Sequence, residues 1–215
     1  MLVEEIMKTN VVTLFPDNTI ADAISLMREK KIRHIPIVNK QNHLVGLVTD
    51  RDIKEAAPSI LEAAERKDIM EKPLESIMKK DIIKGHPLDF VEEVAALFYE
   101  HKIGCLPIMN DNRLVGIITE TDLFHTLVEL TGAHQPGSLI EVKVPNKEGM
   151  LWKIANVIHS HNTNIQSVLV YPDKKKEGYK ILVIRVQTMN PINIINDLKK
   201  EGLLVLWPNF PGIQS

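Results

Sequence analysis

The chain has 215 residues, of which 44% are hydrophobic and 25% are charged, and its formal net charge is −2. These values are typical of a soluble globular protein of one or two domains, and the near-neutral charge excludes the strongly basic surface that nucleic acid requires. The single Cys105 excludes an intramolecular disulfide. We find no signal-like apolar stretch and no apolar run long enough to cross a bilayer, so we expect a cytoplasmic protein that is not bound to membranes.

The first part of the chain predicts a small unit with the order β-α-β-β-α. A short apolar lead-in comes first, and the turn chemistry of Pro16–Thr19 ends in a helix N-cap. Apolar residues at helical spacing, from Ile20 to Met27, then predict an amphipathic helix. The predicted elements are an extended segment at 11–14, a helix at 20–31, strands at 32–38 and 44–49, and a helix from 50 that Pro58 ends.

The same pattern returns about 70 residues later, a period too long for a solenoid repeat. Gly46-Leu-Val-Thr-Asp-Arg-Asp-Ile53 recurs as Gly116-Ile-Ile-Thr-Glu-Thr-Asp-Leu123. Ile6-Met7-Lys8 recurs as Ile77-Met78-Lys79. The repeat predicts a duplicated small domain whose two halves pack on each other. We place the first unit at 1–58, a helical linker at 59–74 and the second unit at 75–130.

Each copy has a Thr and an Asp three residues apart where a strand turns into a helix. They are Thr49 with Asp52 in the first copy and Thr119 with Asp122 in the second. This spacing approximates a capping box, which only stabilises the start of its own helix. A helix N-terminus also favours a phosphate or another polar ligand. The repeat favours the ligand hypothesis, and the capping hypothesis stays open beside it.

The two units resemble a pair of CBS motifs, because each has an apolar-Pro-apolar strand and a closing Gly-x-x-Thr-x-x-Asp segment in the family's order and spacing. The resemblance implies a regulatory ligand, an adenosine nucleotide (AMP, ADP or ATP), in the cleft between the motifs. It implies that the aspartates bind ribose, the threonines face phosphate and the Pro-containing strands face adenine. The residues it implies are Val12, Thr13, Arg33, His34, Ile35, Pro36, Thr49, Arg51 and Asp52, then Ile83, Lys84, Cys105, Leu106, Pro107, Thr119, Thr121 and Asp122.

The two expected sites differ in charge. The first is expected to contain Arg33, His34, Arg51 and Lys54, and the corresponding positions of the second hold Gly104, Cys105, Glu120 and Phe124. Arginine forms fork-shaped, charge-assisted bonds to phosphate, whereas a glutamate repels it. We therefore expect the first site to take a phosphorylated ligand and the second a less charged one. The alternative is that the basic residues simply form a solvated face.

Residues 131–138 contain Gly, Pro and Ser and predict a linker to a further domain at 139–215 with the order β-α-β-β-α-β. Together with Gly149-Met-Leu151 at the first helix, this order resembles an ACT domain, a ferredoxin-like module that often binds amino acids and pairs through its sheet. The fold class is therefore α+β. Asn146 and Glu148 replace the Asp and Pro of the family loop, so dimerisation alone is an equal alternative. The amino-acid site implied by the resemblance contains Asn146, Gly149, Met150, Asn164 and Gln166.

Two CBS motifs followed by an ACT domain resemble the acetoin-utilisation family of spore-forming bacteria. That resemblance implies a regulatory homodimer that controls acetoin or butanediol catabolism through a partner enzyme or regulator. An adaptor that binds a partner enzyme without a small ligand is the alternative. An enzyme of acetoin breakdown is less favoured, because we find no acid–base pair, nucleophile motif or cofactor loop. We expect no metal site either, since no Cys or carboxylate joins His159 and His161 at zinc spacing.

Overall fold

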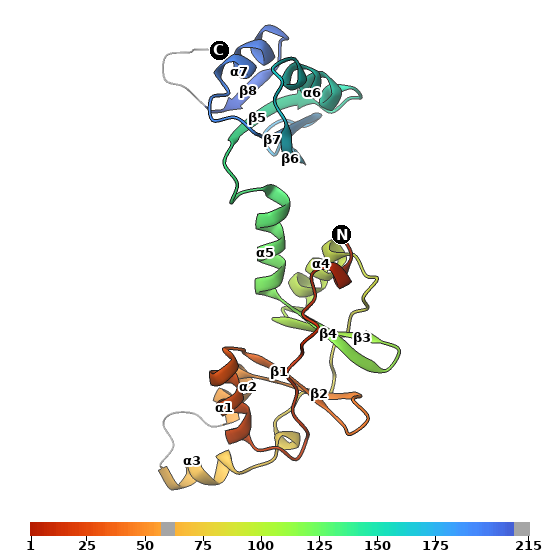
Figure 1. The fold of residues 1–215 in the computed structure, drawn as a ribbon, viewed down its shortest axis with the longest axis vertical. Helices are drawn as coiled ribbons and strands as arrows, with labels where there is room; N and C mark the ends of the chain where they lie inside the picture. The colour runs from red at the N-terminus through yellow and green to blue at the C-terminus, as the bar shows by residue number, and fades with distance from the viewer. Residues whose placement is uncertain (57–62, 209–215) are drawn as a thin grey trace. The chain divides into compact units, whose positions relative to one another are not determined.

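The computed structural model describes residues 1–56 and 63–208 (Figure 1). The chain divides into two compact units, Met1–Phe124 and His125–Ser215, which are described separately. The helix end expected at Pro58 and the start of the expected linker, 59–62, lie outside the described residues. The same holds for 209–215, the last part of the predicted ACT domain.

The first unit contains two copies of one mixed arrangement, which confirms the α+β class (Figure 1). The first copy contains α1 (Ile20–Lys30), β1 (His34–Val38), β2 (Leu44–Thr49) and α2 (Asp50–Ala56). Between the copies lie α3 (Ala63–Met70) and the 3-10 helix η2 (Leu74–Ser76), and another 3-10 helix, η1 (Val3–Glu5), precedes the first copy. The second copy contains α4 (Val91–His101), β3 (Cys105–Asn110), β4 (Arg113–Thr119) and α5 (Glu120–Thr131).

Local sequence explains the start and end of α1. The Thr19 hydroxyl accepts a hydrogen bond from the Asp22 N–H at 3.1 Å, and the Asp22 carboxylate accepts one from the Thr19 N–H at 2.8 Å. This is a complete capping box. Lys31 ends the helix in the left-handed conformation, with φ of 54°. Ile20, Ala23 and Met27 are buried on one face, as the helical spacing predicts.

Each copy has an antiparallel pair of strands, β1 with β2 and β3 with β4. The extended segments that the sequence predicts before α1 and before α4 add only one parallel bridge each, Leu14 to Ile37 and Gly85 to Ile108. After Leu14 the chain turns, since the Asn18 side chain accepts a hydrogen bond from the Phe15 N–H at 2.8 Å. The segment therefore leaves the sheet before it can form a longer strand.

The segments that precede the copies are exchanged between them. We call residues 1–8 the first lead-in and residues 74–79 the second lead-in. Lys8 pairs with Ile117 of β4, and Lys79 pairs with Leu47 of β2. Val3 lies in the core of the second copy, and Leu74 lies in the core of the first. Each motif is therefore completed by the lead-in of the other.

The two motifs also share an apolar contact of their own. Val38 and Leu44 of the first motif are buried with Met109 and Leu114 of the second. These four residues lie near the bulges at which each strand pair shifts register. The cluster and the exchanged lead-ins together join the motifs into one folded unit, as the duplication predicts.

The second unit contains the remainder of α5 and an antiparallel sheet with the strand order β6-β7-β5-β8. Its elements are β5 (Ser138–Pro145), α6 (Met150–Ser160), β6 (Ile165–Pro172), β7 (Tyr179–Val186), α7 (Ile192–Lys200) and β8 (Leu204–Trp207). Alternate residues of β5 and β7 share one buried cluster with α6 and α7, so both helices cover the same face of the sheet (Figure 1). Among the described residues, no helix has the length and apolar character that crossing a membrane requires.

Side chains of the sheet hold the segment that follows α5. The Thr131 carbonyl accepts hydrogen bonds from Ser167 Oγ at 2.8 Å and from Arg185 Nε at 3.2 Å. Gln166 Nε2 donates to the Pro136 carbonyl at 3.2 Å. The part of the chain that the sequence predicts as a linker is thus attached to β6 and β7 within the second unit.

Candidate functional site

Two of the clefts in the first unit are lined by the strands and helix starts of both motifs. The first cleft has a volume of about 350 Å³ and lies between the segment after the first lead-in, the start of β1 and the start of α5. The second cleft has a volume of about 410 Å³ and lies between the segment after the second lead-in, the start of β3 and the start of α2. Both volumes are within the range of small-molecule sites.

Four residues form a wall that the two clefts share. They are His34, Asp50, Gly104 and Glu120. A Cβ atom placed on Gly104 would lie only 2.9 Å from His34 Nε2. Glycine at position 104 therefore leaves the space that the His34 imidazole occupies. As a result, a side chain of the first motif also faces the cleft that contains Cys105 of the second.

The two corresponding side chains, His34 and Cys105, have different protonation properties. Burial lowers the pKa of the His34 imidazole below its usual value of 6.5, and the nearby Arg33 lowers it further. Burial raises the pKa of the Cys105 thiol to about 12, with a smaller contribution from Asp52. Cys105 is therefore a neutral, poorly nucleophilic thiol at physiological pH. The first-motif position instead carries an imidazole whose pKa is held below its usual value.

Both Thr-x-x-Asp segments form helix caps. The Asp52 carboxylate accepts hydrogen bonds from the Thr49 N–H at 2.8 Å and from Thr49 Oγ1 at 2.6 Å. The Asp52 N–H donates to Thr49 Oγ1 at 3.2 Å, which completes the box. The Asp122 carboxylate accepts the same two bonds from Thr119, at 2.9 and 2.6 Å. The capping hypothesis thus describes the geometry of both segments.

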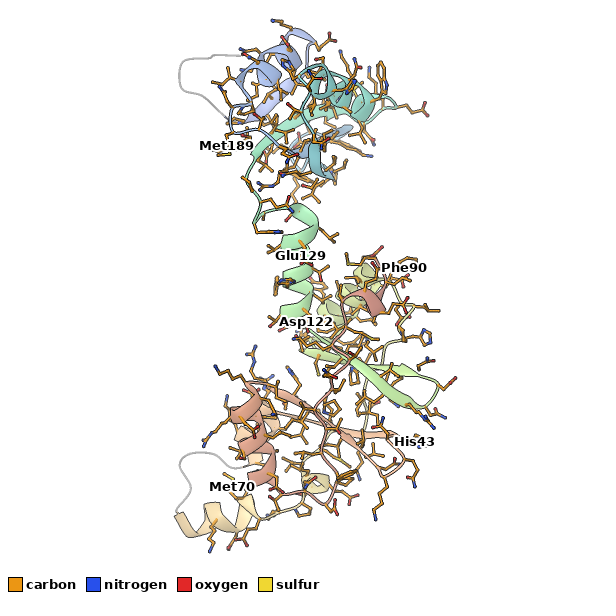
Figure 2. All side chains as sticks on the ribbon, viewed as in Figure 1. His43, Met70, Phe90, Asp122, Glu129 and Met189 are labelled. Carbon is orange, nitrogen blue, oxygen red and sulfur yellow. The ribbon has the colours of Figure 1, made fainter. Side chains whose placement is uncertain are left out.

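Each capping carboxylate also meets a lysine from the exchanged lead-in. Lys79 lies 3.1 Å from Asp52 Oδ1, and Lys8 lies 2.7 Å from Asp122 Oδ1. Figure 2 shows Asp122 at the start of α5. Burial raises the pKa of the Asp122 carboxyl, but hydrogen bonds from Lys8 and Thr119 outweigh it and hold this pKa below its usual value. The two ion pairs are therefore reciprocal links between the motifs.

The structure brings ten of the expected nucleotide-site residues to the clefts. The first cleft is lined by Val12, Arg33, His34, Pro36, Thr119 and Thr121. The second is lined by Thr49, Arg51, Ile83 and Cys105, together with His34. Each cleft thus combines the start of a strand in one motif with the cap threonine of the other motif.

Seven expected residues line neither cleft. Ile35 and Leu106 are fully buried in the cores of their motifs, because alternate residues of a strand point to opposite faces. Asp52 and Asp122 are held in the caps. The other three are Thr13, Lys84 and Pro107.

The charge grouping that the sequence suggests is wrong for two residues. Arg51 lines the second cleft and not the first. Lys54 lies outside both and donates a hydrogen bond to Asp50 at 2.9 Å. The sequence also gave no site role to Lys8, Lys79 or Asp81, which line the clefts. The recurrence of Ile-Met-Lys was the signal that could have identified the two lysines.

The five expected amino-acid-site residues lie around two loops of the second unit. Asn146 and Gly149 belong to the turn between β5 and α6, where Gly149 has φ of 80° and precedes Met150, the first residue of the helix. Asn164 precedes β6, and Gln166 lies within it. The Gln166 amide donates to Gln135 Oε1 and to the Pro136 carbonyl, both at 3.2 Å. In this structure the Gln166 amide group, which is expected in the amino-acid site, therefore donates to the linker.

Comparison with known families agrees with this architecture. The model of the CBS domain matches residues 3–59 and 74–129, and the model of the ACT domain matches residues 138–203. The chain belongs to the CBS-domain proteins and carries an ACT domain after its CBS pair.

Particular relatives resemble mainly the CBS pair. A solved structure from Vibrio cholerae, described as a candidate acetoin utilization protein (AcuB), is 35% identical with a TM-score of 0.55, and the match covers 63% of this chain and 98% of that one. The CBS pair of protein MJ0100, solved with 5′-methylthioadenosine and S-adenosyl-L-methionine, is 27% identical with a TM-score of 0.51, over 63% of this chain and 98% of that one. CBSX2, solved with AMP, is 25% identical with a TM-score of 0.52, over 59% of this chain and 96% of that one.

Some relatives are much longer proteins. Homoserine O-acetyltransferase of Methanococcus vannielii is 34% identical over 127 residues, which are 59% of this chain but only 25% of that enzyme. The similarity thus concerns a CBS module that also accompanies other domains.

Proposed function

We propose that the protein is a regulatory protein whose CBS pair binds an adenosine nucleotide (AMP, ADP or ATP). The observation that carries this proposal is the pair of clefts, each of which combines strand residues of one motif with a cap threonine of the other. A ligand in such a cleft touches both motifs and so favours one arrangement of the pair over others. The adenosine compounds in solved relatives support the same ligand class.

The proposed role of the ACT domain is self-association and transmission of the nucleotide signal. Its hydrogen bonds to Thr131 attach the end of α5 to the sheet, and α5 begins at the first cleft with Glu120. Amino-acid binding near Asn146 or Gln166 would be an additional function of this domain. The resemblance to AcuB supports a role in acetoin utilisation. We further propose a cytoplasmic homodimer that controls a partner enzyme of acetoin or butanediol catabolism and does not itself catalyse a reaction.

A thermal unfolding screen of the full chain tests this proposal. At a ligand concentration 100-fold above the dissociation constant, a nucleotide that binds only the folded state should stabilise it by about 2.7 kcal/mol. GTP and free ribose 5-phosphate are matched controls for the adenine requirement. If no adenosine compound raises the unfolding temperature, the adaptor function replaces this proposal. Turnover of acetoin by the pure protein would contradict the non-catalytic role.

A further inference from the structure

The two clefts differ in the charged groups that remain available to a ligand. Among the described residues, the cations Lys31 and Arg33 line the first cleft without an ion-pair partner, and so does the anion Glu120. The corresponding unpaired residues of the second cleft are one cation, Lys102, and two anions, Asp81 and Glu120. The other charged residues of the two walls are already in ion pairs, namely Lys8 with Asp122, Lys79 with Asp52, Asp50 with Lys54 and Arg51 with Glu55. When the residues in these pairs are left out, the first cleft has two cations and one anion, and the second cleft has one cation and two anions.

The arginines of the two clefts also differ, because the arginine of the second cleft, Arg51, lies 3.4 Å from the Glu55 carboxylate. Arg33 supplies a guanidinium to the first cleft, while the corresponding residue of the second motif is Gly104, which has no side chain. The first cleft also contains the Thr121 hydroxyl in the first turn of the 12-residue helix α5, whereas the Thr119 hydroxyl already donates to Asp122. A guanidinium beside a hydroxyl donor is suited to a phosphate group.

The second cleft has a different character. Both clefts have an apolar wall, formed in the second by Ile82, Ile83 and Ile103, but only the second contains Cys105, whose thiol stays neutral. Asp81 and Glu120 would repel a phosphate, but they would attract hydroxyl groups or a cationic ligand. Glu120 borders both clefts and therefore does not distinguish them, whereas Asp81 is a carboxylate that lines the second cleft and not the first.

We infer that the two clefts take different classes of adenosine ligand: a phosphate-bearing nucleotide in the first cleft, with Arg33 as the specificity residue, and a phosphate-free adenosine compound in the second. This inference rests on the proposed function, since it assumes that adenosine ligands bind in these clefts. It implies that one AMP binds per chain, and that 5′-methylthioadenosine binds alongside it.

Calorimetric titration of the full chain tests the assignment of the first cleft. Arg33→Gln should weaken AMP binding about tenfold to hundredfold, the usual value of a hydrogen bond to a charged group. Arg51→Gln is the matched control, because it removes an arginine from the second cleft only, and it should change AMP affinity less than about threefold. If inorganic phosphate displaces AMP when the two are present at the same concentration, the first cleft is only an anion site and the inference is overturned.

A second titration tests the assignment of the second cleft. Protein saturated with AMP should still bind one 5′-methylthioadenosine per chain. Asp81→Asn, which changes a residue that lines the second cleft and not the first, should allow a second AMP to bind. Equal binding of two AMP molecules by the unaltered protein would overturn the inference and leave the proposed function intact. Failure of every adenosine compound to bind would overturn both.

Discussion

At the scale of single residues, Asp52 is the clearest case in which a stabilising role and a binding role can be separated. Its carboxylate completes a helix cap, so Asp52→Ala should cost about 1 kcal/mol of stability. Asp22→Ala removes the equivalent carboxylate from the capping box of α1, outside both clefts, and should cost about the same. If Asp52 also binds ribose, only Asp52→Ala should weaken the binding of 5′-methylthioadenosine, the ligand inferred for the second cleft that Thr49 lines, about tenfold or more. Equal affinities of the two variants for this ligand would leave Asp52 as a helix cap.

The ion pair between Lys8 and Asp122 should be visible in the pH dependence of stability. The pKa of Asp122 is lowered in the folded state, so its stabilising contribution is present above the ordinary value of 3.8 and is lost as the pH falls through the lowered value. Lys8→Met should lower the free energy of unfolding by up to about 1 kcal/mol at pH 7, because the lysine is largely exposed. The difference should vanish in strong acid. Lys30→Met, which removes a lysine paired only with its neighbour Glu29, should show no such pH dependence in urea unfolding.

His34 should make stability depend on pH in a different range. Its pKa is lowered in the folded state, so between that lowered value and the ordinary 6.5 the unfolded chain binds more protons. Stability should therefore rise with pH through this window and level off above about 6.5. His34→Asn should remove that rise, whereas His43→Asn, in the exposed hairpin loop (Figure 2), should leave it unchanged. An unchanged profile in His34→Asn would show that another group causes the rise.

At the scale of elements, the exchanged lead-ins should contribute to the stability of the motif on which they pack. Leu74 is fully buried in the core of the first motif, so Leu74→Ala should cost about 2–5 kcal/mol. Leu88→Ala is the control, because Leu88 is 60% exposed and its truncation should cost less than about 0.5 kcal/mol. Urea unfolding measures both. Equal effects would contradict the packing of the second lead-in.

Local elements of this fold could be predicted from the sequence, because their signals lie within a few residues. The capping chemistry of Thr19 and the apolar spacing of α1 both predict the observed helix. The exchange of the lead-ins could not be predicted, since the pairing of Lys8 with β4 joins residues more than one hundred positions apart. Side chains alternate between the two faces of a strand, so Pro36 lines a cleft while its neighbour Ile35 is buried in the core. The sequence motif contains both residues and does not show which of them lines the cleft.

At the scale of the whole molecule, we expect a homodimer that pairs through the edge of the second unit. The edge strand β6 has eight residues without a charge, and Leu169, Val170 and Tyr171 are exposed. Edge strands that do not pair usually carry charges, often lysine. Light scattering should therefore give about twice the 24.3 kDa mass of one chain. Val170→Lys should shift the protein towards monomer, whereas Met189→Lys, in the loop before α7 (Figure 2), should not. A monomer at micromolar concentration would contradict this expectation.

The exchange of the lead-ins has a consequence for how such a protein could arise or be divided. A polypeptide that ended after the first motif would contain the first lead-in but not its partner strand, β4. It would also contain β2 but not the second lead-in that pairs with it. If the first lead-in of one such chain paired with β2 of another, two half-length chains could complete each other across a true twofold axis. The present chain would then be the fused form of that ancestral symmetric assembly. Fusion allows the two halves to diverge, and the difference between Arg33-His34 in the first half and Gly104-Cys105 in the second is one that identical halves could not have had.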